Sequence, residues 1–161
     1  MSVGSASSSP QLGSALRAIL WGGLVSGVLD ITAAFVVYGL FGAKPIPLLQ
    51  GIAAGLLGTQ AFAGGLATAA LGLVCHFFIA FSAAAVYFTA SRGIRFAVQH
   101  TIVSGVVYGA LVFFFMNRVV VPLSAARKYP FSLKMMLIGV TIHIFCVGLP
   151  IAIVARKYSV Q

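Results

Sequence analysis

The stretch LRAILWGGLVSGVLDITAAFVVYGLF, residues Leu16 to Phe41, is apolar almost throughout. It is longer than the about 20 residues that a helix needs to cross a bilayer. Within it lies Asp30, the single acidic residue of the 161-residue chain. A charged side chain is costly inside hydrocarbon, so Asp30 must be protonated, paired or hydrated. The stretch therefore predicts a transmembrane helix that carries a polar site.

The rest of the chain is also strongly apolar. Hydrophobic residues make up 61% of the sequence and charged residues 7%, and the mean hydropathy is +1.11. Three further apolar runs are long enough to span a bilayer, at about 66–91, 97–121 and 133–155. With the first run, at about 16–41, they predict an all-α membrane protein built as a bundle of four transmembrane helices.

The segments outside these runs have simpler roles. Residues 1–14 are rich in serine and predict a disordered tail, which leaves 15–161 as one membrane domain. At about 45–62, apolar residues recur at helical spacing among glycines and predict an interfacial or re-entrant helix. An amphipathic connector is favoured over a functional re-entrant loop because few ligating groups are present. Ser132 is predicted to cap the start of the last helix.

Short sequence matches relate the two halves of the chain. VSGV occurs at 25–28 in the first predicted helix and at 103–106 in the third. GxxxHxF occurs at 72–78 in the second and at 139–145 in the fourth. The matches predict two parallel helical-hairpin repeats, and chance similarity between apolar helices is the alternative explanation.

The net charge of +9 comes from basic residues that lie mostly at the ends of the predicted helices. Such residues are typical anchors that meet anionic lipid headgroups, and no nucleic-acid-binding motif accompanies them. The short RGIR loop at 92–95 favours a cytoplasmic location for that side and therefore for both termini. The basic residues near helix ends are Arg17, Lys44, Arg92, Arg95, Arg127, Lys128, Lys134, Arg156 and Lys157.

Several polar side chains fall inside the predicted spans. Counted from the side of the first connector, Asp30, His76 and His143 share one level near the midplane, and Asn117 and Arg118 enter from the third helix about one turn from that side. Glycines at helical spacing allow close helix packing on the same faces, so we expect the polar groups to point at one another. These glycines are Gly23, Gly27, Gly72, Gly105, Gly109 and Gly139.

Four interpretations of this polar cluster stay open. The residues can be interhelical hydrogen-bonding groups of a structural or assembly protein. They can form a proton- or ion-linked transport path, in which Asp30 exchanges a proton with a histidine and Arg118 sets the field at one mouth. His76 and His143 can hold a b-type haem of an electron carrier, or together with Asp30 a metal ion.

The transport interpretation leads because an intramembrane carboxylate is functional by default. Four spans leave little room for a pathway within one chain, so a homo-oligomer is the natural form of a transporter. An enzyme is disfavoured. The sequence has no nucleophile elbow, P-loop or zinc-protease motif, and one acidic residue excludes a mechanism with two carboxylates.

Four stretches resemble a group of uncharacterised small bacterial integral membrane proteins. They are LLQGIAAGLLG (48–58), AFAGGLATAALGLVCHFFIAFSAAAVY (61–87), MNRVVVPLSA (116–125) and GLPIAIVARKYS (148–159). The resemblance extends over 19–159 and implies a four-helix protein of the bacterial inner membrane. It brings no established activity, so no catalytic residue is transferred.

Overall fold

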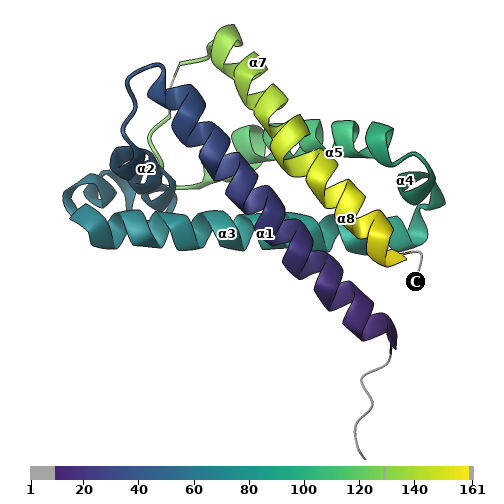
Figure 1. Cartoon of the computed structure of the whole chain (residues 1–161). Helices are drawn as coiled ribbons and strands as arrows, with labels where there is room; N and C mark the ends of the chain where they lie inside the picture. Colours follow the sequence, from purple (N-terminus) through teal and green to yellow (C-terminus); the bar gives the residue numbers. More distant parts are fainter. Residues whose placement is uncertain (1–9, 129, 160–161) are drawn as a thin grey trace, which may run out of the picture.

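The computed structural model describes residues 10–128 and 130–159, and the regular structure in these ranges is entirely helical (Figure 1). Most of it lies in a few long arms joined by short turns. In chain order the elements are α1 (Pro10–Gly39), α2 (Pro45–Leu57), the 3-10 segment η1 (Gly58–Ala63), α3 (Gly65–Gly93), α4 (Arg95–Gln99), α5 (Thr101–Phe115), the π-helical segment η2 (Met116–Val120), α6 (Val121–Leu123), α7 (Leu133–Ile142), the π-helical segment η3 (His143–Gly148) and α8 (Leu149–Ser159).

Five helical stretches of the described ranges are long and apolar enough to span a membrane. The expectation of an all-α membrane protein agrees with this composition. One of the five, Pro45–Ala63, joins α2 to η1 and coincides with the segment predicted to be interfacial or re-entrant. The others are Leu12–Gly39, Gly65–Gly93, Thr101–Leu123 and Leu133–Ser159.

Two element boundaries differ from the sequence prediction. The described part of helix α1 starts at Pro10, a residue that suits the first turn of a helix, and residues 10–14 of the predicted tail are helical. Residues 1–9 lie outside the described ranges. The third predicted span is interrupted at His100, whose φ of −112° and ψ of 56° are not helical, and α5 therefore begins at Thr101. The predicted cap is confirmed, since the Met135 amide donates to Ser132 Oγ at 3.4 Å.

The long arms cross one another in the bundle. Helix α1 packs along α3 and along η3 and α8, and α5 packs against η3 and α8. In Figure 1 these arms run across the view, whereas α2 is seen nearly end-on beside the first turns of α3. Helix α2 therefore lies across the direction of the arms that it contacts.

One core cluster joins the start of α1 to the last turns of α3 and α8. Its buried residues include Ala18 of α1, Phe88 of α3 and Ile151 and Ala155 of α8. These contacts gather the described start of the chain, its described end and the α3–α4 turn at one end of the bundle (Figure 1). The α1–α2 and α6–α7 connections lie at the opposite end.

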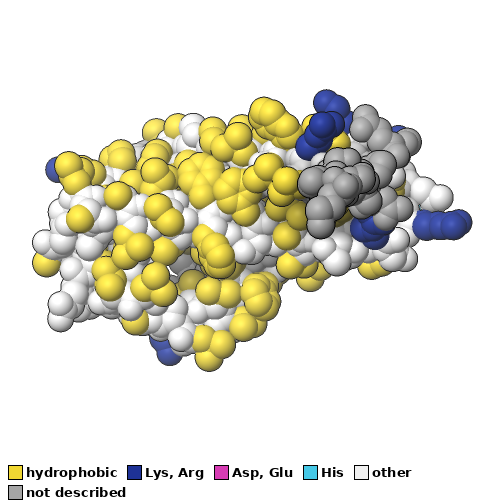
Figure 2. Space-filling model, turned by 90° about the horizontal axis from the view of Figure 1, so that it is seen from below, with side chains coloured by type: hydrophobic (Ala, Val, Ile, Leu, Met, Phe, Trp, Pro, Cys, Tyr) yellow, Lys and Arg dark blue, Asp and Glu magenta, His cyan; other side chains and the backbone are white. Residues whose placement is uncertain are grey.

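Large apolar side chains cover much of the outer surface. Trp21 is 53% exposed, Phe78 71%, Val86 60% and Phe145 63%. Hydrophobic side chains spread over the face in Figure 2, and Lys and Arg side chains lie at its margins. In water this much exposed apolar surface is unfavourable, so the surface matches a hydrocarbon environment.

Polar contacts hold α2 and η1 against the start of α3. Gln50 is only 5% exposed, and its amide donates to the Gly65 carbonyl at 3.0 Å. The Thr68 hydroxyl donates to the Ala61 carbonyl at 2.6 Å. The absence of a side chain at Gly72 lets the backbone of α2 approach α3 closely. The segment is therefore docked on the bundle.

The contact between α5 and η3 gives a test of the packing. A methyl group at Gly109 would lie 2.5 Å from the His143 carbonyl oxygen and 2.6 Å from the Ile144 Cα. Because both are backbone atoms, the two elements would have to separate, and overpacking costs about 1–3 kcal/mol. We expect Gly109→Ala to lower the thermal midpoint of the detergent-solubilised protein by several degrees.

Gly13→Ala is the matched control, because a methyl group there meets nothing within 4 Å. Alanine also favours helix over glycine, so this variant should keep or raise the midpoint. Equal midpoints for the two variants would contradict the close approach of α5 to η3.

Candidate functional site

Asp30 and His143 meet where α1 contacts η3. The Asp30 Oδ1 atom lies 4.0 Å from Nδ1 of His143. Their side chains are 18% and 23% exposed, so both lie mostly inside the bundle.

The Asp30 carboxylate is incompletely satisfied. Its Oδ1 atom is buried and has no hydrogen-bond partner in the described part of the protein. The nearest ring nitrogen, His143 Nδ1, lies 2.9 Å from the Gly139 carbonyl oxygen and donates to it when it carries the proton. The Nδ1–H group therefore donates to a backbone carbonyl, and the buried Asp30 Oδ1 receives no hydrogen bond from the described residues. An unsatisfied buried oxygen is costly in a medium of low dielectric constant.

His76 contacts the same stretch of α1 but not the Asp30 side chain. Its Nε2 lies 2.8 Å from the Gly27 carbonyl oxygen, one turn before Asp30, and donates to it when protonated there. Tyr108 makes a similar link, because its hydroxyl donates to the Ala83 carbonyl of α3 at 2.7 Å. These are interhelical hydrogen bonds of the structural kind.

Asn117 and Arg118 lie apart from this pair. Both are exposed residues of η2. The Asn117 amide donates to the Phe113 carbonyl at 2.9 Å, within its own helix. The ion-pair contact described for Asp30 is with His143, so the expected convergence of Arg118 on the polar cluster is not seen among the described contacts. Both η2 residues instead line an open cleft.

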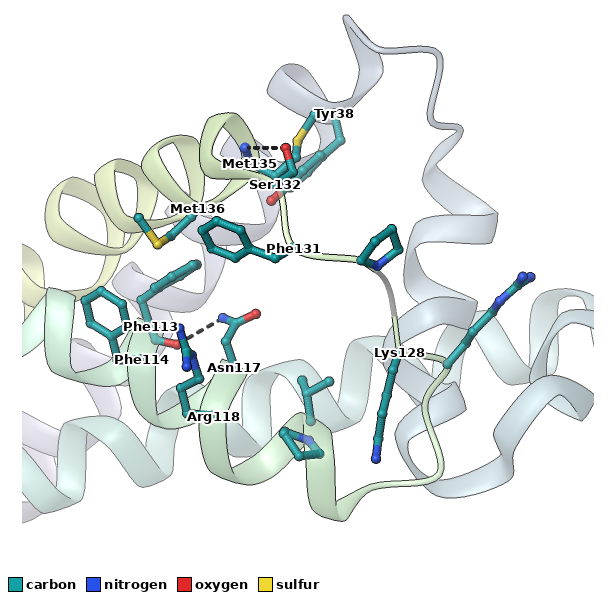
Figure 3. Close-up of a pocket in the computed structure, with 14 residues that line it drawn as sticks. Tyr38, Phe113, Phe114, Asn117, Arg118, Lys128, Phe131, Ser132, Met135 and Met136 are labelled. Carbon is teal, nitrogen blue, oxygen red and sulfur yellow. Dashed lines mark hydrogen bonds between the residues drawn. The ribbon is translucent and has the colours of Figure 1, made fainter.

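The cleft has a volume of about 680 Å³. Its walls come from the end of α1, from α5 to α6, and from the segment that leads into α7 (Figure 3). Three basic residues line it, Arg118, Arg127 and Lys128. Aromatic and methionine side chains, among them Phe114 and Met136, form much of the remaining wall.

The Phe113 side chain connects the cleft to the buried pair. Its ring lines the cleft, and its centroid lies 5.4 Å from that of the His143 ring, edge to face. Tyr38, eight residues after Asp30 in α1, also lines the cleft. His143 therefore contacts a residue of the cleft wall.

Two π-helical segments flank this region, and sequence reasoning did not find them. Segment η3 begins at His143, and η2 carries Asn117 and Arg118. The wider turn leaves backbone groups displaced from the α-helical pattern and is frequent at functional sites. A signal was present in the sequence, because each segment ends two residues before a proline, Pro122 after η2 and Pro150 after η3. A proline inside a helix removes one i→i−4 hydrogen bond and crowds the carbonyl of residue i−4, here Arg118 and Cys146 within the two π-helical segments.

The six glycines singled out by the sequence lie at helix contacts. Gly23 and Gly27 of α1 face Phe81 and Phe77 of α3, and Gly72 faces the backbone of α2. On the other side, Gly105 lies against Leu149, Gly109 against the backbone of His143, and Gly139 against the Phe113 ring. These last two contacts bring η3 and Phe113 together beside the pair.

The two histidines do not fit a haem held between them. The polar contact of His76 is with Gly27 of α1, and His143 faces Asp30 of the same helix. A porphyrin between the imidazoles would need space where α1 packs on α3 and η3. In the described residues no three His, Cys, Asp or Glu side chains come together as a metal-ligand group.

Comparisons with known proteins add no assignment: neither models of protein families, nor curated proteins, nor solved structures gave a match to this chain.

The stability of two variants separates the roles of Asp30 and His76. Asp30→Asn keeps the shape of the side chain and removes a buried oxygen that lacks a donor, so the thermal midpoint should stay equal or rise. His76→Leu removes the hydrogen bond to α1 and should cost about 0.6–2 kcal/mol. Both are measured by thermal unfolding in detergent. A clear loss of stability in Asp30→Asn would make the carboxylate a structural group.

Proposed function

We propose that this chain is a multi-pass membrane protein that moves protons, alone or coupled to a solute, through the Asp30–His143 pair. The observation that carries the proposal is the buried Asp30 Oδ1 without a hydrogen-bond partner, 4.0 Å from an imidazole nitrogen. A structural carboxylate is normally satisfied by donors, whereas a proton carrier must be able to gain and lose its proton. The incomplete bonding favours the second role.

The proton step requires only a small movement of His143. A doubly protonated imidazole turns its Nδ1–H from the Gly139 carbonyl toward Asp30 Oδ1 and transfers that proton. The products are a neutral carboxylic acid and a neutral imidazole that keeps its proton on Nε2. Loss of the proton from Asp30 to the other side, and uptake of a new one by His143, restore the starting charges.

The cleft supports a proton more than a metal cation as the moving species. A metal cation would pass three basic residues and then find one carboxylate in the whole chain. Oxygen-rich coordination is what hard cations require. A proton needs one carboxylate oxygen and one imidazole, and the Phe113 ring between the cleft and His143 then acts as the boundary of the pathway.

The proposed architecture has four spans, formed by α1, α3, α5 with η2 and α6, and α7 with η3 and α8. Helix α2 with η1 lies across the end of the bundle as an interfacial or re-entrant segment, and its end-on view beside α3 supports this placement. The hairpin repeat remains a prediction. Its two histidines have different surroundings, because His76 lies in α-helix and His143 opens a π-helical segment.

The proposed location is the bacterial inner membrane with both termini cytoplasmic. The end of the bundle with the RGIR turn holds Arg17, Arg92, Arg95, Arg156 and Lys157, and the opposite end holds as many basic residues, so the proposed orientation rests on the shortness of the RGIR loop. The pair in one chain lies beside a single cleft, so a homodimer supplies the simplest route for a continuous pathway.

Proton flux into liposomes tests the role of the pair. The protein is reconstituted with a pH-sensitive dye inside the vesicles, and a potassium diffusion potential drives protons inward. We expect flux above that of protein-free vesicles, and we expect Asp30→Asn and His143→Ala to lower it to the protein-free level.

His100→Ala is the control, because His100 is exposed at the α4–α5 junction and stacks on Phe96 with ring centroids 4.5 Å apart. Its flux should equal that of the wild-type protein. Two results would contradict the proposal. One is a proton flux in Asp30→Asn equal to that of the wild-type protein, and the other is no protein-dependent proton flux with either sign of the potassium diffusion potential.

A further inference from the structure

We infer that the cleft beside η2 is a binding site for the headgroup of an acidic phospholipid. This inference does not depend on proton movement, because it rests on charges and side chains that line the cleft and not on the Asp30–His143 pair. The ligand chemistry is a phosphoryl anion joined to an apolar body.

The basic side chains of the cleft lack an internal counter-charge. Arg118, Arg127 and Lys128 line it, and the only acidic residue of the chain is Asp30, whose ion-pair contact is with His143. In Figure 3, Arg118 comes from the helical wall, with its side chain beside Phe113 and Phe114, and Lys128 comes from the loop on the opposite side of the cleft. Cations that line one cleft without a carboxylate attract anions, and the Arg guanidinium suits phosphate oxygens in particular.

Apolar groups continue the cleft beyond the charges. Phe131 is 72% exposed and Phe114 40% exposed, and Met135 and Met136 lie along the same wall. In Figure 3 the Phe131 ring and the Met136 side chain extend over the opening on the α7 side. A soluble anion would gain nothing from this surface, whereas acyl chains or a glycerol backbone would cover it.

The position of the cleft suits a lipid. The cleft lies beside the C-terminal turn of α1, beside α6 and beside the first turn of α7. This side of the bundle is opposite the side that holds the first and last described residues. A basic pocket between transmembrane helices binds an acidic headgroup through charge and hydrogen bonds to its phosphate oxygens, and this chemistry is the same in either leaflet. Lys134 at the same end differs, because its amine lies 4.6 Å over the Phe41 ring and it does not line the cleft.

Lipid titration with matched variants tests the site. Phosphatidylglycerol and phosphatidylcholine are titrated separately into the detergent-solubilised protein, and bound lipid is counted by native mass spectrometry. We expect preferential binding of phosphatidylglycerol, weakened about thirtyfold by Arg127→Gln with Lys128→Gln. Lys44→Gln with Lys134→Gln removes the same charge from the same end and should weaken binding less than about threefold.

Arg118 lies in a different element, η2, and Arg118→Gln should also weaken the binding of phosphatidylglycerol. Arg118→Lys should recover part of that affinity, because lysine keeps the positive charge but lacks the planar guanidinium. Thermal midpoints confirm that each variant is folded, and Arg127 and Lys128 are exposed loop residues whose replacement leaves the bundle intact.

Three results would overturn the inference. One is equal binding of the acidic and zwitterionic lipids. Another is equal weakening by the cleft pair and the control pair of substitutions, which would reduce the effect to general surface charge. The third is binding of inorganic phosphate or glycerol 3-phosphate as tight as that of phosphatidylglycerol, which would assign the cleft to a soluble phosphoryl compound.

Discussion

A carboxylate inside hydrocarbon has to be sheltered by neighbouring helices, and the packing around Asp30 follows from that constraint. Gly109 and Gly139 have no side chains, so η3 lies directly on α5 and the Phe113 ring fits beside His143. Where α1 packs on α3, the Phe77 ring lies against Gly27, which has no side chain. The Gly27 carbonyl accepts the hydrogen bond from His76. This packing leaves the Asp30 side chain 18% exposed and its Oδ1 atom buried without a donor in the described part of the protein.

The bundle separates two kinds of polar chemistry. The buried pair has one carboxylate and one imidazole, whereas the cleft has three cations and an apolar wall. Phe113 belongs to the surroundings of both. A change in the cleft that moved the Phe113 ring would therefore alter the environment of His143, which gives a physical route from lipid binding to the proposed proton step. Such coupling needs differential contacts in two states.

The irregular helical segments lie where these two zones meet. His143 of the buried pair is the first residue of η3, and Arg118 of the cleft lies in η2. The backbone therefore departs from the α-helical pattern at a residue of the pair and at a residue of the cleft. A π-helical turn changes the direction in which the following side chains point and loosens the hydrogen-bond ladder. The rest of the long arms, which carry the lipid-facing surface and the glycine contacts, keeps regular helix geometry.

Hydropathy and spacing along the chain determined the helical class, the approximate extents of the long arms and the Ser132 cap. They also determined the nearness of Asp30 to His143, because the length of a span and the depth of a residue in the bilayer follow from residue positions along the sequence. Tertiary structure decided the rest. Whether Arg118 faces Asp30 or a cleft depends on the rotation of η2 about its axis, and α2 takes its direction from Gln50 and Gly72 contacts with α3. Rotation and crossing are set by packing between segments distant in sequence, which no local pattern of residues encodes.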